Sequence, residues 1–240
     1  AAFVRHAFEG GDLAPLIQER LASLRPGPAG AAGLMELGTL FQLASDRVRA
    51  LECQRLALSA ERLYRWSQAG SDGLKVLMLV TAGDLMTNTP LELMVEGRGV
   101  EVVRLFLDAS SPMPDAVPDH DLAVMAVSES DETRPILEQL VGIEARWPRP
   151  MLNRADQVLE LARDRLYHRI EGAPGLVIPP TFRMARAELV ASPPDLPMIL
   201  RPVGSHAGKA LEKIDTPEAL AAYLAAEPAE RLYASPFVDY

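Results

Sequence analysis

The spacing of apolar side chains changes near residue 70, from a helical period to a strand-like one. Before that point apolar residues recur three and four positions apart, as on one stripe of an α-helix, at Leu13, Leu16, Ile17, Leu21 and Leu24. Beyond it, the run from Leu74 to Val80, apolar except for Lys75, is typical of a short buried strand. We therefore expect residues 1–70 to be helical throughout and an α/β arrangement to follow.

The helical pattern divides into three predicted helices. The first runs from Asp12, which is placed to cap it, to the stop at Arg25–Pro28; the second covers about 29–43; the third starts at Ser45 or Asp46 and reaches about Ser67. Small residues in the second helix would let a neighbour approach closely: Ala31, Ala32, Gly33 and Gly38. This segment resembles tetratricopeptide-like helical hairpins, although it lacks a clean repeat of about 34 residues. Two interpretations remain open: a module that binds a protein or peptide partner, or an extension used for packing or for forming a homodimer.

The stretch Gln68–Gly73 reads as a linker to a small parallel α/β domain, residues 71–147. Its predicted strands and helices alternate in the order 74–80, a short helix capped by Thr89 with Pro90 in its first position, 100–107, 122–127 and a helix over 131–141. Ligands of such sheets bind at the carboxyl ends of the strands, here Thr81–Asn88, Asp108–Ser111 and Ser128–Asp131. We interpret Asp84 and Asp108 as turn and cap residues.

The remaining segment, residues 148–240, contains a glycine-rich loop that could bind phosphate. Its predicted elements are a helix from Asn153 or Asp156 to about Glu171, an extended stretch at 176–181, a short helix or strand at 182–190, a strand from Met198, a helix at 216–226 and a final strand from Leu232. Arg201 ends the strand, and Gly204 to Lys209 follow as a glycine-rich turn. A cation beside glycine amides suits a phosphate group, although the Walker A spacing is absent.

Composition and charge disfavour several functional classes and favour a cytoplasmic protein. The formal net charge of −9 disfavours nucleic acid as a partner. The sequence has no apolar run of about 18–20 residues, so we expect no membrane span, and the first residues lack a signal-peptide core, which favours the cytoplasm. The single cysteine, Cys53, reads as a packing residue, and the scattered histidines predict no metal site. The abundance of alanine, leucine, arginine and proline is typical of a bacterial source.

From residue 74 onward, the order of segments resembles the first half of the ATP-grasp fold, as found in D-alanine–D-alanine ligases and glutathione synthetases. The matching stretches, in chain order, are Asn153 with Asp164-Arg165, Leu176–Thr181, Ile199–Gly208 and Tyr233–Asp239. The fold that this implies is α/β: N-terminal helices, a small parallel pre-ATP-grasp domain, and the first lobe of an ATP-grasp fold.

The resemblance also implies roles for individual residues. Arg165 and Arg201 would stand where the family places lysines against the nucleotide phosphates. The loop over the β- and γ-phosphates would comprise Gly204, Ser205 and Gly208, with added charge from His206 or Lys209. The hinge that reads adenine would comprise Ser235, Phe237 and Val238. Arginine stays charged, but its exchange for lysine at a tight site is not conservative.

The family's magnesium ligands and most acceptor contacts belong to a half that would follow Tyr240. We therefore expect ATP as the nucleotide, Mg²⁺ ligands outside this chain, and little catalysis by the chain alone. The expected parent activity is a ligase that converts an unknown carboxylate substrate to an acyl phosphate and passes it to an amine or other nucleophile. The alternatives are a non-enzymatic partner-binding protein with a degenerate ATP-grasp-like domain, and a plain α/β binding domain unrelated to ATP-grasp.

Overall fold

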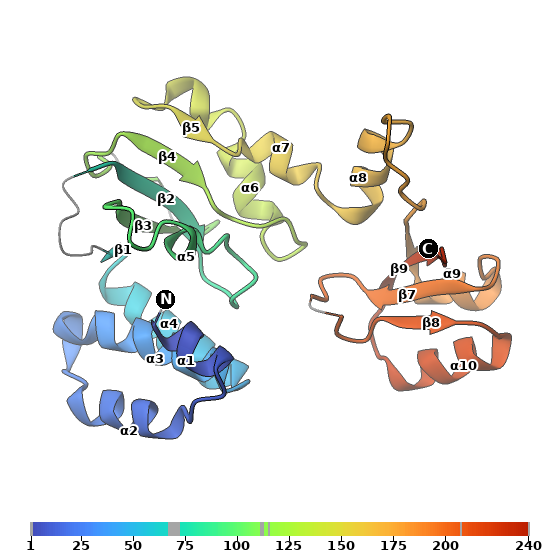
Figure 1. Ribbon diagram of the computed structural model, residues 1–240, viewed down its shortest axis with the longest axis horizontal. Coiled ribbons are helices and arrows are strands. Elements are labelled where there is room, and N and C mark those ends of the chain that lie inside the picture. Colours follow the sequence, from blue (N-terminus) through green and yellow to red (C-terminus); the bar gives the residue numbers. More distant parts are fainter. Residues whose placement is uncertain (1, 67–72, 111–112, 115, 207, 240) are drawn as a thin grey trace. The chain divides into compact units, whose positions relative to one another are not determined.

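The chain folds into two compact units, Ala1–Val158 and Leu159–Tyr240 (Figure 1). The computed structural model describes residues 2–66, 73–110, 113–114, 116–206 and 208–239. The predicted fold class is confirmed: N-terminal helices, a mostly parallel sheet with helices, then an antiparallel sheet. The finer division at 70/71 and 147/148 remains a prediction. The linker at Gln68–Gly73, apart from Gly73, lies outside the described residues.

The first unit is built on a five-stranded sheet of order β1-β3-β2-β4-β5. Its strands are β1 (Leu63–Trp66), β2 (Lys75–Thr81), β3 (Glu101–Leu107), β4 (Leu122–Met125) and β5 (Met151–Leu152). The helices of this unit are α1 (Ala2–Phe8), α2 (Ala14–Ser23), α3 (Ala31–Leu43), α4 (Arg47–Ala60), α5 (Leu91–Met94), α6 (Arg134–Leu140) and α7 (Ala155–Leu159), with 3-10 turns η1 (Gly27–Gly30) and η2 (Ile143–Arg146). The strands pair in parallel except β1, which runs antiparallel to β3 at one edge.

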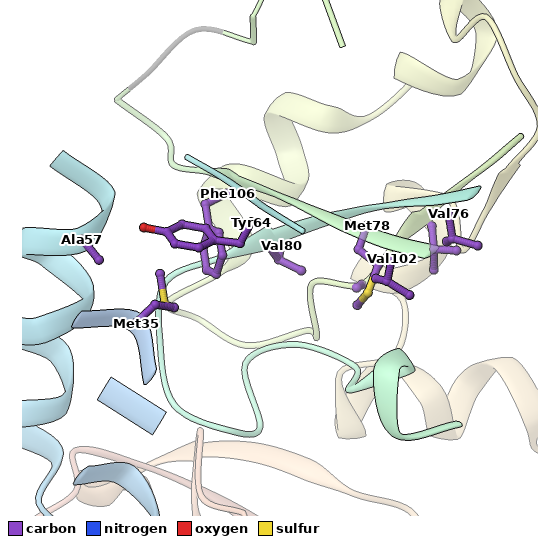
Figure 2. Close-up of a cluster of buried hydrophobic side chains, with 10 residues drawn as sticks. Met35, Ala57, Tyr64, Val76, Met78, Val80, Val102 and Phe106 are labelled. Atoms are coloured by element: carbon purple, nitrogen blue, oxygen red, sulfur yellow. The ribbon is translucent and has the colours of Figure 1, made fainter. Parts of the chain in front are cut away.

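Helices α3 and α4 cover one face of this sheet. Met35 from α3 and Ala57 from α4 pack against alternate residues of the strands, as Figure 2 shows for Val76, Met78, Val80, Val102 and Phe106. The two helices approach closely at Gly38, where a Cβ would lie 3.2 Å from the Ala50 carbonyl oxygen. Gly38, one of the small residues predicted to allow a close approach, therefore lies at this helix crossing. Residues of β2 on both faces are buried, as expected for a central parallel strand.

The prediction that residues 1–70 are helical throughout is wrong at its end. Helix α4 stops at Ala60, and Leu63–Trp66 forms β1 instead of a last helical turn; the predicted end at Ser67 lies outside the described residues. Tyr64 packs edge-on against Phe106 of β3, with ring centroids 5.7 Å apart. This packing and the ladder to β3 outweigh a helical continuation, because they bury aromatic area.

The second unit is built on a four-stranded antiparallel sheet of order β6-β9-β7-β8. Its elements are α8 (Arg163–Ile170), β6 (Phe182–Ala185), α9 (Arg186–Ala191), β7 (Met198–Pro202), β8 (Glu212–Ile214), α10 (Pro217–Ala226) and β9 (Arg231–Pro236). Leu200 and Leu232 are fully buried against Tyr223 and Leu224 of α10. One face of this sheet therefore carries the core of the unit.

Several predicted boundaries change. The helix expected from Asn153 or Asp156 to Glu171 is two helices, α7 and α8, because Ala162 between them is extended (φ −53°, ψ 138°). Strand β8 was not predicted. Thr89 does not cap α5, whose N-cap is Pro90, and Leu13 rather than Asp12 is the N-cap of α2. Asp46, one of the two residues predicted to open α4, caps that helix, and Thr216 caps α10, whose start the sequence predicts; each side chain accepts a backbone N–H bond.

Within the described part of the chain, no helix combines the length and apolar character needed to cross a membrane.

Candidate functional site

Strand β7 positions Arg201 at the base of the glycine-rich loop. Met198 and Leu200 are fully buried, so the alternate residue Arg201 lies on the other side of the strand, where it is half-buried. Arg201 pairs with Tyr233 of β9 across the antiparallel ladder. The backbone thus fixes its Cα between two strands and directs the long side chain toward the loop that follows.

The loop folds back over the Arg201 side chain. Its guanidinium donates from Nε to the Ser205 hydroxyl at 3.1 Å and from Nη2 to the Ser205 carbonyl oxygen. The Ser205 hydroxyl in turn donates to the Pro202 carbonyl at 2.8 Å. Gly204 has φ +78°, a conformation that L side chains adopt reluctantly, which explains glycine at this position. Arg201 and its loop are therefore held together by Ser205.

The charge of one further arginine, Arg163, acts on Arg201. Burial, and secondly the neighbouring charge of Arg163, lower the pKa of the Arg201 guanidinium. An arginine nevertheless stays charged at neutral pH. A partly buried guanidinium with a second positive charge acting on it favours an anionic ligand, such as a phosphate group.

The distal half of the loop is anchored separately. The Lys209 amide donates to the His206 carbonyl at 3.0 Å, and Gly208 again has a positive φ, +74°. Tyr223 of α10 donates its hydroxyl to the Ala210 carbonyl at 2.8 Å, and burial raises the pKa of Tyr223 to about 12. Ala207 lies outside the described residues. The predicted loop residues thus belong to one loop tethered at Ser205 and Ala210.

Arg165 does not share these contacts. It lies on α8, where its Nη1 donates to the Leu159 carbonyl at 3.3 Å and lies 3.5 Å from the Glu160 carboxylate. Such a half-exposed pair contributes little to stability. The residue of α8 whose charge reaches Arg201 is instead Arg163. Sequence matching missed Arg163, because it carries no motif signal of its own.

The predicted hinge residues lie at the end of β9. Ser235 pairs with Ile199 of β7, and the Phe237 amide donates to the Pro197 carbonyl at 3.0 Å. The Phe237 ring carries the Lys213 ammonium over its face, 4.2 Å from the centroid. Phe237 and then Val238 follow the last ladder pair, Met198 with Pro236. The described geometry is that of a strand end leaving the sheet, with its side chains half-buried.

The carboxyl ends of the parallel strands in the first unit hold turn residues. Asp84 accepts from the Met86 amide at 2.9 Å, and Asp108 accepts from the Ser110 amide at 2.8 Å. Their interpretation as turn residues is confirmed. The described residues contain no group of three or more histidine, cysteine or acidic side chains arranged to hold a metal ion.

Comparison with known proteins adds a structural likeness. Neither a protein-family model nor a curated protein matches the sequence. A solved RimK domain protein of ATP-grasp type from Sphaerobacter thermophilus DSM 20745 is similar over 69% of this chain and 64% of its own, with 18% identity and a TM-score of 0.41. D-alanine–D-alanine ligase from Bacillus anthracis, complexed with ATP, is similar over 70% and 60%, with 11% identity and a TM-score of 0.43.

A third solved structure, N5-carboxyaminoimidazole ribonucleotide synthetase from Thermotoga maritima, is similar over 69% of this chain and 46% of its own, with 13% identity and a TM-score of 0.39. The chain therefore corresponds to less than two thirds of the length of each of these proteins.

Proposed function

We propose that this chain is the nucleotide-binding portion of an ATP-grasp-type ligase that joins a carboxylate to an amine or another nucleophile. The observation that carries the proposal is the half-buried guanidinium of Arg201, held at the base of a loop with two positive-φ glycines. Arginine and loop amides together offer the charge and the N–H donors that a polyphosphate requires. The order of the sequence motifs around this loop supports the same assignment.

In this proposal, Arg201 binds a phosphate oxygen once its hydrogen bonds to Ser205 are released. Gly204, Ser205 and Gly208 approach the phosphates through their backbone, and His206 or Lys209 adds charge. Ser235, Phe237 and Val238 hold the adenine edge at the end of β9. The part of Arg165 is the least supported, because its guanidinium already contacts Leu159 and Glu160.

The proposed reaction transfers the γ-phosphoryl group of ATP to a carboxylate oxygen and leaves ADP. The resulting acyl phosphate then loses inorganic phosphate to the incoming nucleophile. Magnesium would spread the charge of the transferred group, and its ligands would come from outside the described residues. This chain's contribution is to bind and orient the nucleotide. The carboxylate and the nucleophile are substrates of unspecified identity.

Calorimetric titration of MgATP, and of ATP without metal, tests the proposal. We expect saturable binding that Arg201→Ala weakens at least tenfold, about 1.4 kcal/mol. Arg231→Ala is the matched control, because Arg231 is an exposed arginine at the start of β9, and it should leave affinity unchanged. Equal affinity of the wild type and Arg201→Ala would remove Arg201 from the site.

A second candidate is a partner-binding protein whose nucleotide site no longer functions. It is favoured by arginine at both lysine positions and by the engagement of Arg165 with Glu160. In that case neither nucleotide form binds, and the helices of residues 1–70 become the part to test with protein or peptide partners, including a second copy of the chain.

A further inference from the structure

The parallel strands of the first unit begin at the edge of the sheet opposite the one that carries Asp84 and Asp108, and a buried histidine lies there. His120 is 3% exposed and comes two residues before the first residue of β4, Leu122. The other three histidines are partly or fully exposed. A buried imidazole loses its hydrogen bonds to water, so its two ring nitrogens need partners within the protein.

Both ring nitrogens of His120 have partners, and the partners fix the tautomer. Nδ1 lies 2.7 Å from the Pro118 carbonyl oxygen, which can only accept a hydrogen bond, so Nδ1 carries the ring hydrogen. Nε2 lies 2.9 Å from the indole Nε1 of Trp147, which can only donate, so Nε2 carries none. The His120 ring is therefore neutral in this arrangement, and Nε2 cannot take up a proton while the indole bond exists.

The Trp147 indole holds the connection that leads to β5. Trp147 directly follows η2, and β5, which has only two residues, pairs with β4 at the edge of the sheet (Figure 1). The backbone adds one bond just before β5, from the Ala123 amide to the Pro150 carbonyl at 2.9 Å. An edge strand this short contributes few ladder bonds, so the bond between indole and imidazole is a large part of what fixes this connection to the sheet.

The charged groups nearest to the imidazole already have partners. Asp119 accepts from the Lys75 ammonium at 3.2 Å, and Asp121 accepts from the Lys75 amide at 2.9 Å. Lys75, and after it Arg149 and His120, lower the pKa of the Asp119 carboxyl, so these charges lie close together. Asp119 attracts a protonated His120, whereas Lys75 and Arg149 repel it. Among the described side chains, neither carboxylate lies within ion-pair distance of the His120 ring.

The turn η2 carries the remaining charged groups near Trp147. Glu144 lies 3.3 Å from Arg154, the residue before α7, and Arg146 immediately precedes the tryptophan. The Glu144 carboxylate is therefore already paired. In the described part of the chain, a proton added to His120 thus gains no carboxylate hydrogen bond in place of the indole bond that it breaks.

We propose that His120 and Trp147 form a pH-sensitive latch, in which protonation of His120 at Nε2 releases the Trp147 indole and loosens β5 and the connection that precedes it. A protonated imidazole has two N–H donors and no acceptor, so its Nε2–H would face the indole N–H and the bond would be lost. Imidazoles change charge between about pH 5 and 8, so the latch is closed at the alkaline end of this range and open at the acidic end. The proposal does not rest on the proposed nucleotide site, which lies in the other unit.

Nuclear magnetic resonance of the full chain, with nitrogen-15 in histidine and tryptophan, tests the latch. At about pH 8 we expect His120 to carry its proton on Nδ1. As the pH falls to about 5, the His120 ring signals and the Trp147 indole N–H signal should change together, with one midpoint. A ring that carries its proton on Nε2, a ring that stays neutral down to about pH 5, or an indole signal that does not follow the ring overturns the proposal.

Amide hydrogen exchange locates the loosening. The Ala123 amide donates to Pro150, and the Ala126 amide of the same segment donates to Leu79 of β2, both at 2.9 Å. Protection of the Ala123 amide, corrected for the intrinsic pH dependence of exchange, should fall at least tenfold on acidification, and that of Ala126 should not change. Equal losses at both amides would mean a general loss of structure and would overturn the proposed release of β5.

Variants separate His120 from other titrating groups. In a Trp66→Phe background, Trp147 is the only tryptophan, and its fluorescence should shift to longer wavelength on acidification. His120→Gln should abolish this shift, because a glutamine carbonyl can accept from the indole at every pH. His168→Gln is the matched control, since its side chain is 71% exposed, and it should leave the shift intact. A shift that persists in His120→Gln contradicts the latch. Circular dichroism identifies a variant that fails to fold, and the wild-type resonance titration then decides the question.

Discussion

The two units of this chain each contain a partly buried arginine and a buried tyrosine, and the hydrogen bonds of these side chains differ. In the second unit both side chains hold the loop after β7: Arg201 donates to Ser205, and Tyr223 donates to Ala210. In the first unit Arg104 Nε and the Tyr64 hydroxyl have no hydrogen-bond partner among the described residues. Arg201 must therefore release its loop before it can bind a ligand, whereas Arg104 Nε and the Tyr64 hydroxyl hold no loop in place.

The apolar cores of both sheets contain fully buried leucines. Leu77 of β2 and Leu200 of β7 are both 0% exposed. We expect Leu77→Ala and Leu200→Ala each to cost about 3 kcal/mol of unfolding free energy, since each leaves a cavity. Urea denaturation measures the loss. Leu74→Ala, at a leucine that is 46% exposed, is the control and should cost far less; a small effect at Leu200 alone would mean a looser second core.

Gln54 tests how strongly side chains hold the turn that follows β2. Gln54→Ala removes both hydrogen bonds to Gly83 and should cost about 2 kcal/mol, because it leaves partly buried backbone groups with fewer partners. Gln42→Ala removes a single bond to the same carbonyl and should cost about half as much. Thermal unfolding followed by circular dichroism gives both values. Equal, negligible losses would show that the turn holds its shape unaided.

The two tyrosines give the sharpest contrast. Tyr223→Phe should destabilise the protein by about 1 kcal/mol, because it removes the hydrogen bond to Ala210. Tyr64→Phe should be neutral or slightly stabilising, since its hydroxyl is buried without a partner in the described protein. Both values come from urea denaturation at neutral pH. A loss at Tyr64 equal to that at Tyr223 would show that the Tyr64 hydroxyl has a hydrogen-bond partner, and would contradict this contrast between the two units.

Raising the pH above 10 should have the smallest and most gradual effect on the free energy of unfolding. Burial raises the pKa of Tyr64 and of Tyr223 from 10.0 to about 12. Between these values the unfolded chain loses its phenolic protons while the folded chain keeps them, so stability should fall as the pH rises from about 10 to 12. Tyrosinate absorbance and unfolding in parallel measure this. The slope should shrink in either phenylalanine variant, and an unchanged slope in both would contradict the assignment.

Much of the fold could be predicted from hydrophobic spacing. The apolar runs of β2 and β3 and the capped starts at Asp46 and Thr216 are local signals, and the structure follows them. Strand β1 was missed because its pairing with β3 depends on contacts more than thirty residues away. The single helix expected up to Glu171 was wrong because no residue type in the sequence announces the extended backbone at Ala162.

The sites were predictable to different extents. The loop after β7 is marked by its glycines and by Arg201, so the sequence points to it directly. Arg163 becomes relevant only through three-dimensional proximity, and it carries no local signal. Arg104 did carry one: it breaks the apolar alternation between Val102 and Phe106. A charged residue at a core-facing position of a strand can therefore mark a functional or strained position, as a motif can.

Hydrogen exchange with and without MgATP tests most directly whether the loop over residues 203–211 is the nucleotide-responsive part of the chain. We predict that MgATP changes amide protection at Ser205 and Lys209 and leaves the Gly83 amide, held by Gln54, as it is. We also predict that Arg201→Ala abolishes the change. Protection that does not change in the loop, or that changes equally in Arg201→Ala, would contradict the proposed nucleotide site.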